Sequence, residues 1–461
     1  MKRYLSLAGL LALALSFAAC NGVSNSSSTA QNKAQVFVTG EDAPVSSVVA
    51  FKITIDSITL NNGTTAAQVL STPTSVDFGQ LVGLRSLLGF NTVAPGTYTS
   101  ATFTFAASNP APSIDYVDLT TNPPSISTAT GTLSNPTVTV AFPTTAPLVV
   151  GSNGLAGLHT DFDLRQSLAM DGNGNLIINN GTIAVTPVLD VMAVSASDSL
   201  GQITEFIGNI VSVNTAGNSF VVQGPYGFQE TIDVNTNTLY NGSNSLSSLM
   251  ANSIVCVEGT VQADGSILAA GVEQITTDKA FISGRILAVN PGPVVTMFVG
   301  EELGTSATIA ADSVYTVDLS QVSQYDICFI DNWFTNELFS ASSLVVGQRI
   351  FVGGTYQNNG FTPDVVSLRR QGVIGSLVPN SVSITSGNQG SYQMQNDLLM
   401  SYSAGGPFSV YTGAQTLFVN VNGLAGLQAA GAANLVSSGL VFYNPNTSKP
   451  VVLAGRVRVL P

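Results

Sequence analysis

The stretches that decide the fold are residues 48–60, VVAFKITIDSITL, and residues 97–105, TYTSATFTF. In both, β-branched or aromatic side chains alternate with small or polar ones, most regularly in the TFTF segment at residues 102–105. A period of two places one set of side chains on one face, which is typical of a half-buried β-strand. Further runs of this kind at residues 36–38 and 137–142 predict an all-β protein.

Turn residues such as Asn61-Asn62-Gly63 separate these runs at short intervals. Closely spaced short strands with few helices between them favour a β-sandwich, immunoglobulin- or transthyretin-like, over residues 35–197. The exception is residues 78–88, where leucines at helical spacing predict a helix.

The composition excludes several classes of protein. The chain has 461 residues, of which 44% are hydrophobic and 9% charged, and its formal net charge is −13. Disorder over the whole chain is excluded, because disordered chains combine high charge with few apolar residues. Fourteen Lys and Arg residues are too few for the dense phosphate contacts of a nucleic-acid-binding protein. With one His and three Cys, we expect no metal or other cofactor.

The N-terminus predicts export. Lys2 and Arg3 precede an apolar segment at residues 5–19. This segment is too short to span a bilayer comfortably, so residues 1–19 are predicted to be a signal peptide.

The end of this segment, SFAAC, resembles the bacterial lipobox, whose cysteine, here Cys20, is lipidated and becomes the mature N-terminus. Phe17 departs from the aliphatic residue usual in that motif, and cleavage after Ala19 without lipidation is the alternative. Residues 20–34 predict a flexible tether. Asn21 stands where an Asp would retain a lipoprotein at an inner membrane, so the resemblance implies anchoring to an outer membrane. Cleavage removes two positive charges and changes the formal net charge from −13 to −15.

A weak internal repeat begins near residue 202. Three segments open alike, with FIGNI at residues 206–210, ISGRI at 282–286 and VIGSL at 373–377. Five strands with a short helix between the third and fourth predict an OB-like β-barrel for each copy. The predicted boundaries of the three copies, the last of them atypical, are 202–276, 279–370 and 371–461.

Two families resemble these segments. The pieces VFVTGEDAPVSSVVAFKITIDSITL, VDFGQLVGL, APGTYTSATF and DFDLRQSL are similar to domain of unknown function 4382, which is common in bacterial lipoproteins. The repeat pattern G-x-I, L-x-x-G, V-x-V-x-G and D-G-x-I resembles domain of unknown function 5666, best in the first copy. The first resemblance implies a β-sandwich on an exported protein, and neither implies an activity.

The single histidine is a candidate for chemistry. On a strand, His159, Asp161 and Asp163 share one face at a spacing of about 7 Å, which is one way to build a metal or acid–base cluster. A catalytic triad also needs a nucleophile on a sharp turn, and the chain contains no G-x-S-x-G motif. We therefore favour a structural role for these three residues.

Residues 171–175, DGNGN, resemble the start of a calcium loop, with Asp171, Asn173 and Asn175 as weak candidate ligands. An EF-hand loop has Gly at its sixth position, where this sequence has Leu176. A glycine-rich hairpin turn is the favoured interpretation.

Two cysteines remain besides Cys20. Cys256 and Cys328 lie in different repeats and are flanked by apolar residues. An exported protein permits a disulfide, but we predict two buried free thiols.

The second repeat carries an insertion at residues 317–340 that contains the only tryptophan of the chain. Long excursions from a rigid barrel often carry ligand contacts, and aromatic rings beside carboxylates suit sugar binding. The alternative is that these rings cap the barrel. The candidate ligand-binding residues are Trp333, Tyr325, Phe334, Asp326 and Asp331.

The sequence as a whole predicts an exported, lipid-anchored, non-catalytic protein of the cell envelope, with a structural or ligand-binding function. The expected partners are the membrane, through the lipid anchor, and a glycan or a protein. The alternative is a carbohydrate-active enzyme, for instance a glycoside hydrolase, or its accessory binding subunit. No pair of carboxylates can be chosen from the sequence for that chemistry.

Overall fold

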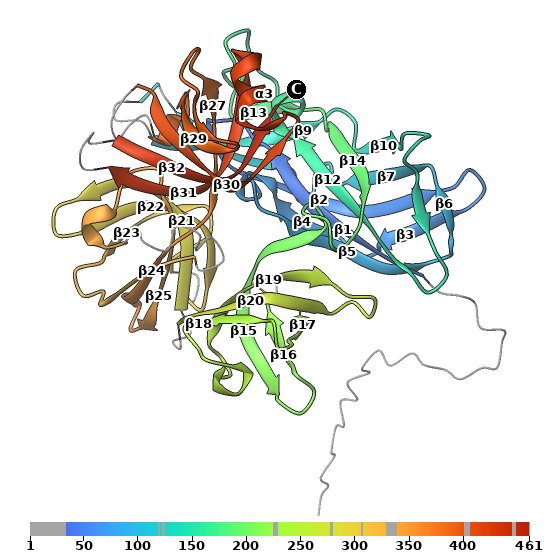
Figure 1. Cartoon of the computed structure of the whole chain (residues 1–461), viewed down its shortest axis with the longest axis horizontal. Coiled ribbons are helices and arrows are strands. Elements are labelled where there is room, and N and C mark those ends of the chain that lie inside the picture. Colours follow the sequence, from blue (N-terminus) through green and yellow to red (C-terminus); the bar gives the residue numbers. More distant parts are fainter. Residues whose placement is uncertain are drawn as a thin grey trace, which may run out of the picture. The chain divides into compact units, whose positions relative to one another are not determined.

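The computed structural model describes residues 34–118, 120–121, 125–224, 229–276, 280–305, 308–328, 339–400, 406–444 and 449–460. Strands dominate these residues, as Figure 1 shows, and the prediction of a nearly all-β protein is confirmed. Cys20 and the predicted signal peptide lie outside the described residues. In the part that is described, no helix has both the length and the apolar character needed to cross a membrane.

The N-terminal lobe is defined here as residues 34–194. Its elements are β1 (Ala34–Ala43), β2 (Val48–Asn61), β3 (Ala66–Leu70), β4 (Thr74–Asp77), η1 (Phe78–Gln80), β5 (Ser86–Val93), β6 (Gly96–Tyr98), β7 (Ser100–Phe105), β8 (Ser113–Asp118), β9 (Ser125–Leu133), β10 (Thr137–Ala141), β11 (Leu148–Val150), β12 (Leu155–Asp163), α1 (Leu164–Ser167), β13 (Thr182–Val185) and β14 (Leu189–Val194). One sheet has the order β14-β12-β1-β5, and β1 runs parallel to β12. A second sheet has the order β10-β7-β2-β8-β9-β13, with β3 and β4 also paired to β2.

Side chains from these two sheets meet in one hydrophobic core. Phe51 of β2 and Phe162 of β12 come from different sheets, and their ring centroids lie 5.2 Å apart. Along β7, Ala101, Phe103 and Phe105 are buried and the residues between them are half-buried. The alternation in the sequence therefore marks the side chains that face this core.

Residues 78–88 do not form the predicted helix. The segment contains one short turn, η1, and then the beginning of strand β5 at Ser86. Gly83 has a φ of +71°, which interrupts helical backbone. Leu84 and Leu88 are buried, and the β5 strand that contains Leu88 pairs with β1. The leucine spacing reflects burial in a turn and a strand, so the helix prediction was wrong.

Three ring lobes follow, each built on one sheet. The first (residues 202–276) contains β15 (Gln202–Asn214), β16 (Ser219–Gln223), β17 (Gln229–Asp233), β18 (Leu239–Asn241), η2 (Leu246–Ser248), β19 (Ile254–Val261) and β20 (Ile267–Thr276). The second (280–368) contains β21 (Ala280–Asn290), β22 (Val294–Leu303), β23 (Ser313–Asp318), β24 (Gln324–Ile327), η4 (Ala341–Ser343), β25 (Arg349–Gln357) and β26 (Gly360–Leu368). The third (371–460) contains β27 (Gln371–Leu377), β28 (Ser383–Ser386), β29 (Gln389–Gln395), β30 (Phe408–Val419), α3 (Gly423–Ala430), β31 (Asn434–Asn444) and β32 (Lys449–Val459).

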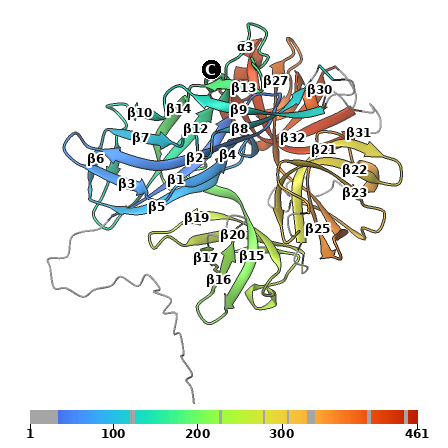
Figure 2. The same cartoon turned by 180° about the vertical axis from the view of Figure 1, so that it is seen from behind.

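The first and third ring lobes close in the same way. In the first, β15 pairs with β16 and β19, and the parallel pairing of β17 with β20 completes the ring. In the third, β27 pairs with β29 and β31, and the parallel pairing of β30 with β32 has the same position. In the second, β24 runs parallel to β26. Figures 1 and 2 show each of these sheets curling on itself.

Hydrophobic clusters join the lobes. Cys256 of the first ring lobe packs in one cluster with Phe281 and Phe351 of the second. Val82 of the N-terminal lobe packs in another with Val436 of the third ring lobe. Lys33–Pro461 accordingly forms one compact unit.

Candidate functional site

A cleft of about 590 Å³ lies between the N-terminal lobe and the third ring lobe. Its volume is within the roughly 300–1,000 Å³ of pockets that bind small ligands. The side chains that line it from the N-terminal lobe belong to the β1–β2 loop, β8, α1 and the loop after α1. Those from the third ring lobe belong to β27, the start of β31 and the segments that follow β29 and β32. Residues more than 200 positions apart in the sequence therefore form one site.

The short helix α1 places Arg165 at this cleft. The carboxylate of Asp163 caps the helix, because its Oδ1 accepts a hydrogen bond from the backbone N–H of Gln166 at 3.0 Å. Leu164 and Ser167 are buried, and the hydroxyl of Ser167 accepts a hydrogen bond from the N–H of Val188 at 2.9 Å. The helix is thus fixed on both sides of Arg165, whose half-buried side chain lines the cleft.

The guanidinium of Arg165 makes no hydrogen bond or ion pair with the part of the chain that the structure describes. Each of the other seven described arginines has such a partner, so Arg165 is the exception. Those seven are Arg85, Arg285, Arg349, Arg369, Arg370, Arg456 and Arg458.

Asp118 is the single carboxylate among the described residues that line the cleft. Its Oδ1 accepts hydrogen bonds from the N–H and the hydroxyl of Thr120, at 2.9 and 2.6 Å. Its Oδ2 accepts a third from the hydroxyl of Ser127, at 3.3 Å. The hydrogen bonds from Thr120 lower the pKa of Asp118 most, so this carboxylate is ionised at neutral pH.

Uncharged groups make up the rest of the lining. The half-buried Tyr116 contributes a ring that also packs on the N-terminal core. Hydroxyl, amide and apolar side chains line the cleft with it. The polar members are Ser46, Ser47, Thr120, Asn173, Asn175, Ser376, Asn396 and Asn434, and the larger apolar members are Val45, Val117, Met170, Leu176, Ile178, Ile374, Leu398 and Leu460.

Two of the three weak calcium candidates, Asn173 and Asn175, line the cleft, and all three lie in a hairpin-like turn. Asp171 Oδ1 accepts the N–H groups of Asn173 and Asn175 at 2.8 and 2.9 Å, and Oδ2 accepts the side-chain amide of Asn175 at 3.0 Å. A bridge between Met170 and Leu176 closes the turn. Within the described residues no group of three or more His, Cys, Asp or Glu side chains suits a metal ion. The contacts match the glycine-rich turn that the sequence favoured.

Of the residues predicted for ligand binding in the insertion, Tyr325 and Asp326 do not line this cleft. Tyr325 and Asp326 lie in β24, which pairs with β26. The Tyr325 ring packs edge-on against Phe339 at 5.7 Å, and Asp326 accepts a hydrogen bond from Gln324 at 2.6 Å. The other three candidates, Asp331, Trp333 and Phe334, lie outside the described residues.

His159 belongs to a buried charged cluster. Its Nδ1 lies 3.2 Å from the Thr39 hydroxyl and its Nε2 3.7 Å from a Glu41 carboxylate oxygen. Burial lowers the pKa of His159 to about 4, although Glu41 opposes this shift. The other Glu41 oxygen accepts a hydrogen bond from Arg456 of the third ring lobe at 2.6 Å, and Arg458 pairs with Asp161. This cluster joins two lobes.

The other lobe junctions contain similar pairs. Arg369 donates to Glu273 of the first ring lobe at 2.5 Å and to Cys256 Sγ at 3.2 Å. Both cysteines are buried thiols, as predicted, and burial raises the pKa of the Cys256 thiol. Lys52 of the N-terminal lobe pairs with Asp312.

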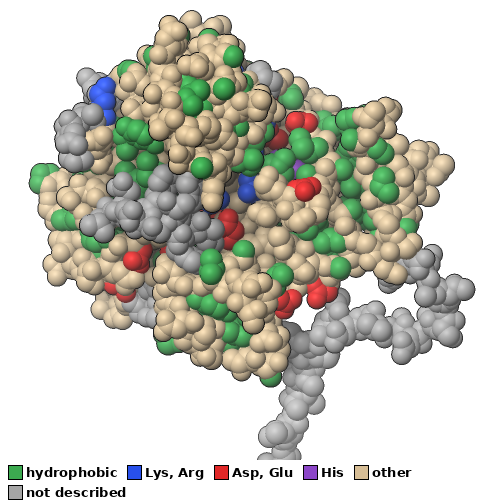
Figure 3. Space-filling view, in the orientation of Figure 1, with side chains coloured by type: hydrophobic (Ala, Val, Ile, Leu, Met, Phe, Trp, Pro, Cys, Tyr) green, Lys and Arg blue, Asp and Glu red, His purple; other side chains and the backbone are tan. Residues whose placement is uncertain are grey.

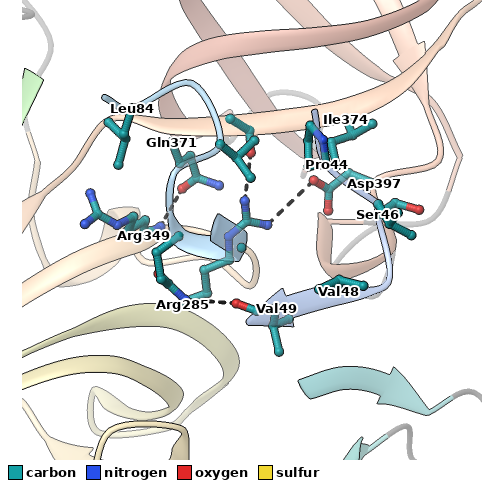
Figure 4. A pocket seen from close by; sticks show the side chains of 15 residues that line it. Pro44, Ser46, Val48, Val49, Leu84, Arg285, Arg349, Gln371, Ile374 and Asp397 are labelled. Atoms are coloured by element: carbon teal, nitrogen blue, oxygen red, sulfur yellow. Dashed lines mark hydrogen bonds and ion pairs between the residues drawn. The ribbon is translucent and has the colours of Figure 1, made fainter. Parts of the chain in front are cut away.

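A narrow cavity of about 20 Å³, too small for a ligand, marks another junction (Figure 4). There Arg285 Nη2 donates to the carbonyl of Gly372 at 2.7 Å, and Nη1 lies 3.8 Å from Asp397. Figure 4 shows the Arg285 guanidinium directed toward Asp397. The cations thus lie mostly between lobes, and blue side chains are rare on the face drawn in Figure 3.

Comparison with known proteins identifies two segments. Residues 33–179 match the family described as Domain of unknown function (DUF4382), and residues 207–273 match Domain of unknown function (DUF5666). Both resemblances predicted from the sequence are confirmed, in the predicted order. No curated protein matches the chain. Tyr116, Asp118 and Arg165 lie in the first matched segment, whereas the opposite wall of the cleft follows both.

Proposed function

We propose that this chain is an exported, lipid-anchored and non-catalytic protein of the cell envelope that binds a ligand, a glycan or a protein, in the cleft between its N-terminal and third ring lobes. The signal-like segment ending at Cys20 supports the anchor, and the tether of residues 20–34 separates the lipid from the body. Asn21 favours an outer membrane as the site of anchoring.

We also propose a finer fold assignment. The shared core of the two N-terminal sheets supports a β-sandwich, immunoglobulin- or transthyretin-like. The closed pairing order of the first and third ring lobes supports OB-like barrels, since a five-stranded OB barrel closes on itself. Five strands close the third ring: β27, β29, β30, β31 and β32. Helix α3 lies between β30 and β31, the third and fourth of these, which supports counting this lobe as a repeat.

The observation that supports the proposed function most is that oppositely charged side chains form buried pairs at the junctions between lobes. Glu205 holds Arg349 of the second ring lobe, and Glu41 holds Arg456 of the third. Glu273 holds Arg369, which lies between these two lobes, and all three carboxylate side chains are buried. Removing either partner of such a pair is costly, because the other charge stays buried without compensation. Because these pairs fix the lobes, the cleft has its shape before a ligand binds. Binding then costs little free energy for ordering the site.

The same arrangement disfavours the alternatives. A glycoside hydrolase needs two carboxylates at its scissile bond, and the described lining of the cleft offers Asp118. A carbohydrate-binding accessory role is compatible with the cleft. Nucleic acid binding needs an exposed basic surface, whereas the paired arginines lie mostly at lobe junctions.

The proposed function can be tested with the full-length chain expressed in a bacterium with an outer membrane. Mass spectrometry should find a diacylglyceryl group on Cys20 in the membrane fraction, and Cys20→Ser should release the protein. The purified protein should bind members of a glycan and protein array without releasing reducing sugar from a polysaccharide panel. Unmodified Cys20 would disprove the anchor, sugar release would disprove the non-catalytic assignment, and no binding on the array would disprove the ligand-binding role.

A further inference from the structure

We propose that the cleft recognises an acidic saccharide, with the guanidinium of Arg165 holding the carboxylate of a uronic acid unit. This inference rests on the proposed ligand-binding function and adds the chemical class of the ligand.

The Arg165 guanidinium is available to a ligand. The other described arginines are held by carbonyl, carboxylate or thiol groups, whereas Arg165 faces the cleft without a partner in the described chain. A guanidinium presents N–H donors in a planar fork that matches a carboxylate, and such pairs are frequently bidentate. The hydrogen bonds of Asp163 and Ser167 fix the helix that carries this guanidinium.

The other side chains that line the cleft suit the hydroxyl groups of a sugar. Amide and hydroxyl side chains from both lobes line the cleft together with the Tyr116 ring. Such groups donate to and accept from sugar hydroxyls, and the ring offers an apolar surface to a sugar face. Asp118, already ionised, can accept further hydrogen bonds from hydroxyl groups and disfavours a carboxylate directly beside it. The lining therefore suits a chain of sugar hydroxyls with a carboxylate at Arg165, which a uronate unit provides and a peptide chain does not.

The cleft is also rigid. Val117, itself a lining residue, and Leu399, which follows the lining residue Leu398, pack in one buried cluster with Phe298 of the second ring lobe. Leu460, itself a lining residue, packs against Val82. The two walls are therefore held by contacts outside the cleft, and Arg165 keeps its position relative to Asn396 and Asn434.

The experiment is calorimetric titration of the full-length protein in detergent with trigalacturonate. Fully methyl-esterified trigalacturonate is the matched uncharged ligand, and triglycine tests a peptide carboxylate. Arg165→Gln removes the proposed contact, and Arg165→Lys keeps the charge without the fork. Lys449→Gln removes the same charge outside the cleft, where the ammonium group donates to the Pro407 carbonyl.

We expect saturable binding of trigalacturonate, with a loss of affinity of about ten-fold or more for the methyl ester and for Arg165→Gln, as for a charge-assisted hydrogen bond. Arg165→Lys should be intermediate, and Lys449→Gln should bind like the unchanged protein. Equal affinity of Arg165→Gln would overturn the inference, as would equal binding of the ester, preference for triglycine, or no saturation by about 1 mM. In these cases the ligand-binding function is judged separately, by the array.

Discussion

Arg349 and Glu205, 144 positions apart in the sequence, form two parallel hydrogen bonds, Nη1 to Oε2 at 2.9 Å and Nη2 to Oε1 at 2.8 Å. Both side chains are buried, with 7% and 6% of their surfaces exposed. Burial opposes the charge on Glu205, but Arg349 and Arg369 outweigh it and lower the pKa of this carboxyl. This bidentate pair joins the first and second ring lobes.

Glu205→Ala should lower the free energy of unfolding by about 3 kcal/mol, because the Arg349 charge stays buried without its partner. Arg349→Met should have a similar effect. The double variant should be destabilised by clearly less than the sum of the two, since it leaves no unpaired charge. Denaturant unfolding monitored by fluorescence measures all three, and strictly additive losses would show that the two residues are not coupled.

The buried His159 predicts a pH dependence of stability. Its pKa is about 4 in the folded protein and about 6.5 in the unfolded chain. The unfolded state therefore takes up the proton first, and this contribution to stability is complete above pH 6.5 and is lost as the pH falls toward 4. Relative to His159→Gln, the unchanged protein should lose about 3 kcal/mol over this range. Urea unfolding at several pH values checks this, and parallel pH profiles of the two proteins would contradict it.

Close backbone approach at Gly372 predicts a steric effect at the junction of the N-terminal and third ring lobes. A Cβ atom at this position would overlap the side chain and carbonyl of Val82. Gly372→Ala should therefore cost about 1–3 kcal/mol, as overpacking does. Gly96→Ala is the matched control, because a Cβ there has no neighbour within 4 Å. Thermal unfolding of both variants measures the difference, and equal melting temperatures would argue against close packing at this junction.

Burial of the two thiols predicts that they do not react in the folded protein. Cys256 is 3% exposed and Cys328 6%, and burial raises the pKa of Cys256, which keeps this thiol protonated. A thiol-specific reagent should label neither in buffer and both in denaturant. Rapid labelling of the native protein would show that the core around Arg369 is open.

The period-two pattern in residues 102–105 and the turn signals predicted the strands correctly, because strand periodicity and glycine turns are local properties. The helix predicted at residues 78–88 was wrong, because burial of Leu84 and Leu88 in a turn and a strand produces the same leucine spacing as a helix. The insertion is a different case. Tyr325 lies in a strand and packs on Phe339, but Asp331, Trp333 and Phe334 lie outside the described residues, so the ligand-binding role of the insertion stays a prediction.

The cleft was missed because its two walls come from opposite ends of the chain, and no local pattern reports their contact. One signal was available in retrospect. Arg165 is a rare cation in a chain with 9% charged residues, and it lies in the DFDLRQSL segment that resembles the first family. The roles of Arg349 and Arg369 could not be predicted from the sequence, because their pairing with Glu205 and Glu273 depends on how the lobes pack.

The central claim is that buried pairs between lobes make the described body one rigid unit. Differential scanning calorimetry of the full-length chain tests it most directly. Chains of this size with separate domains usually unfold in several steps. We expect a single transition whose calorimetric and van't Hoff enthalpies agree, and which splits in Glu205→Ala. Two or more resolved transitions in the unchanged protein would contradict it.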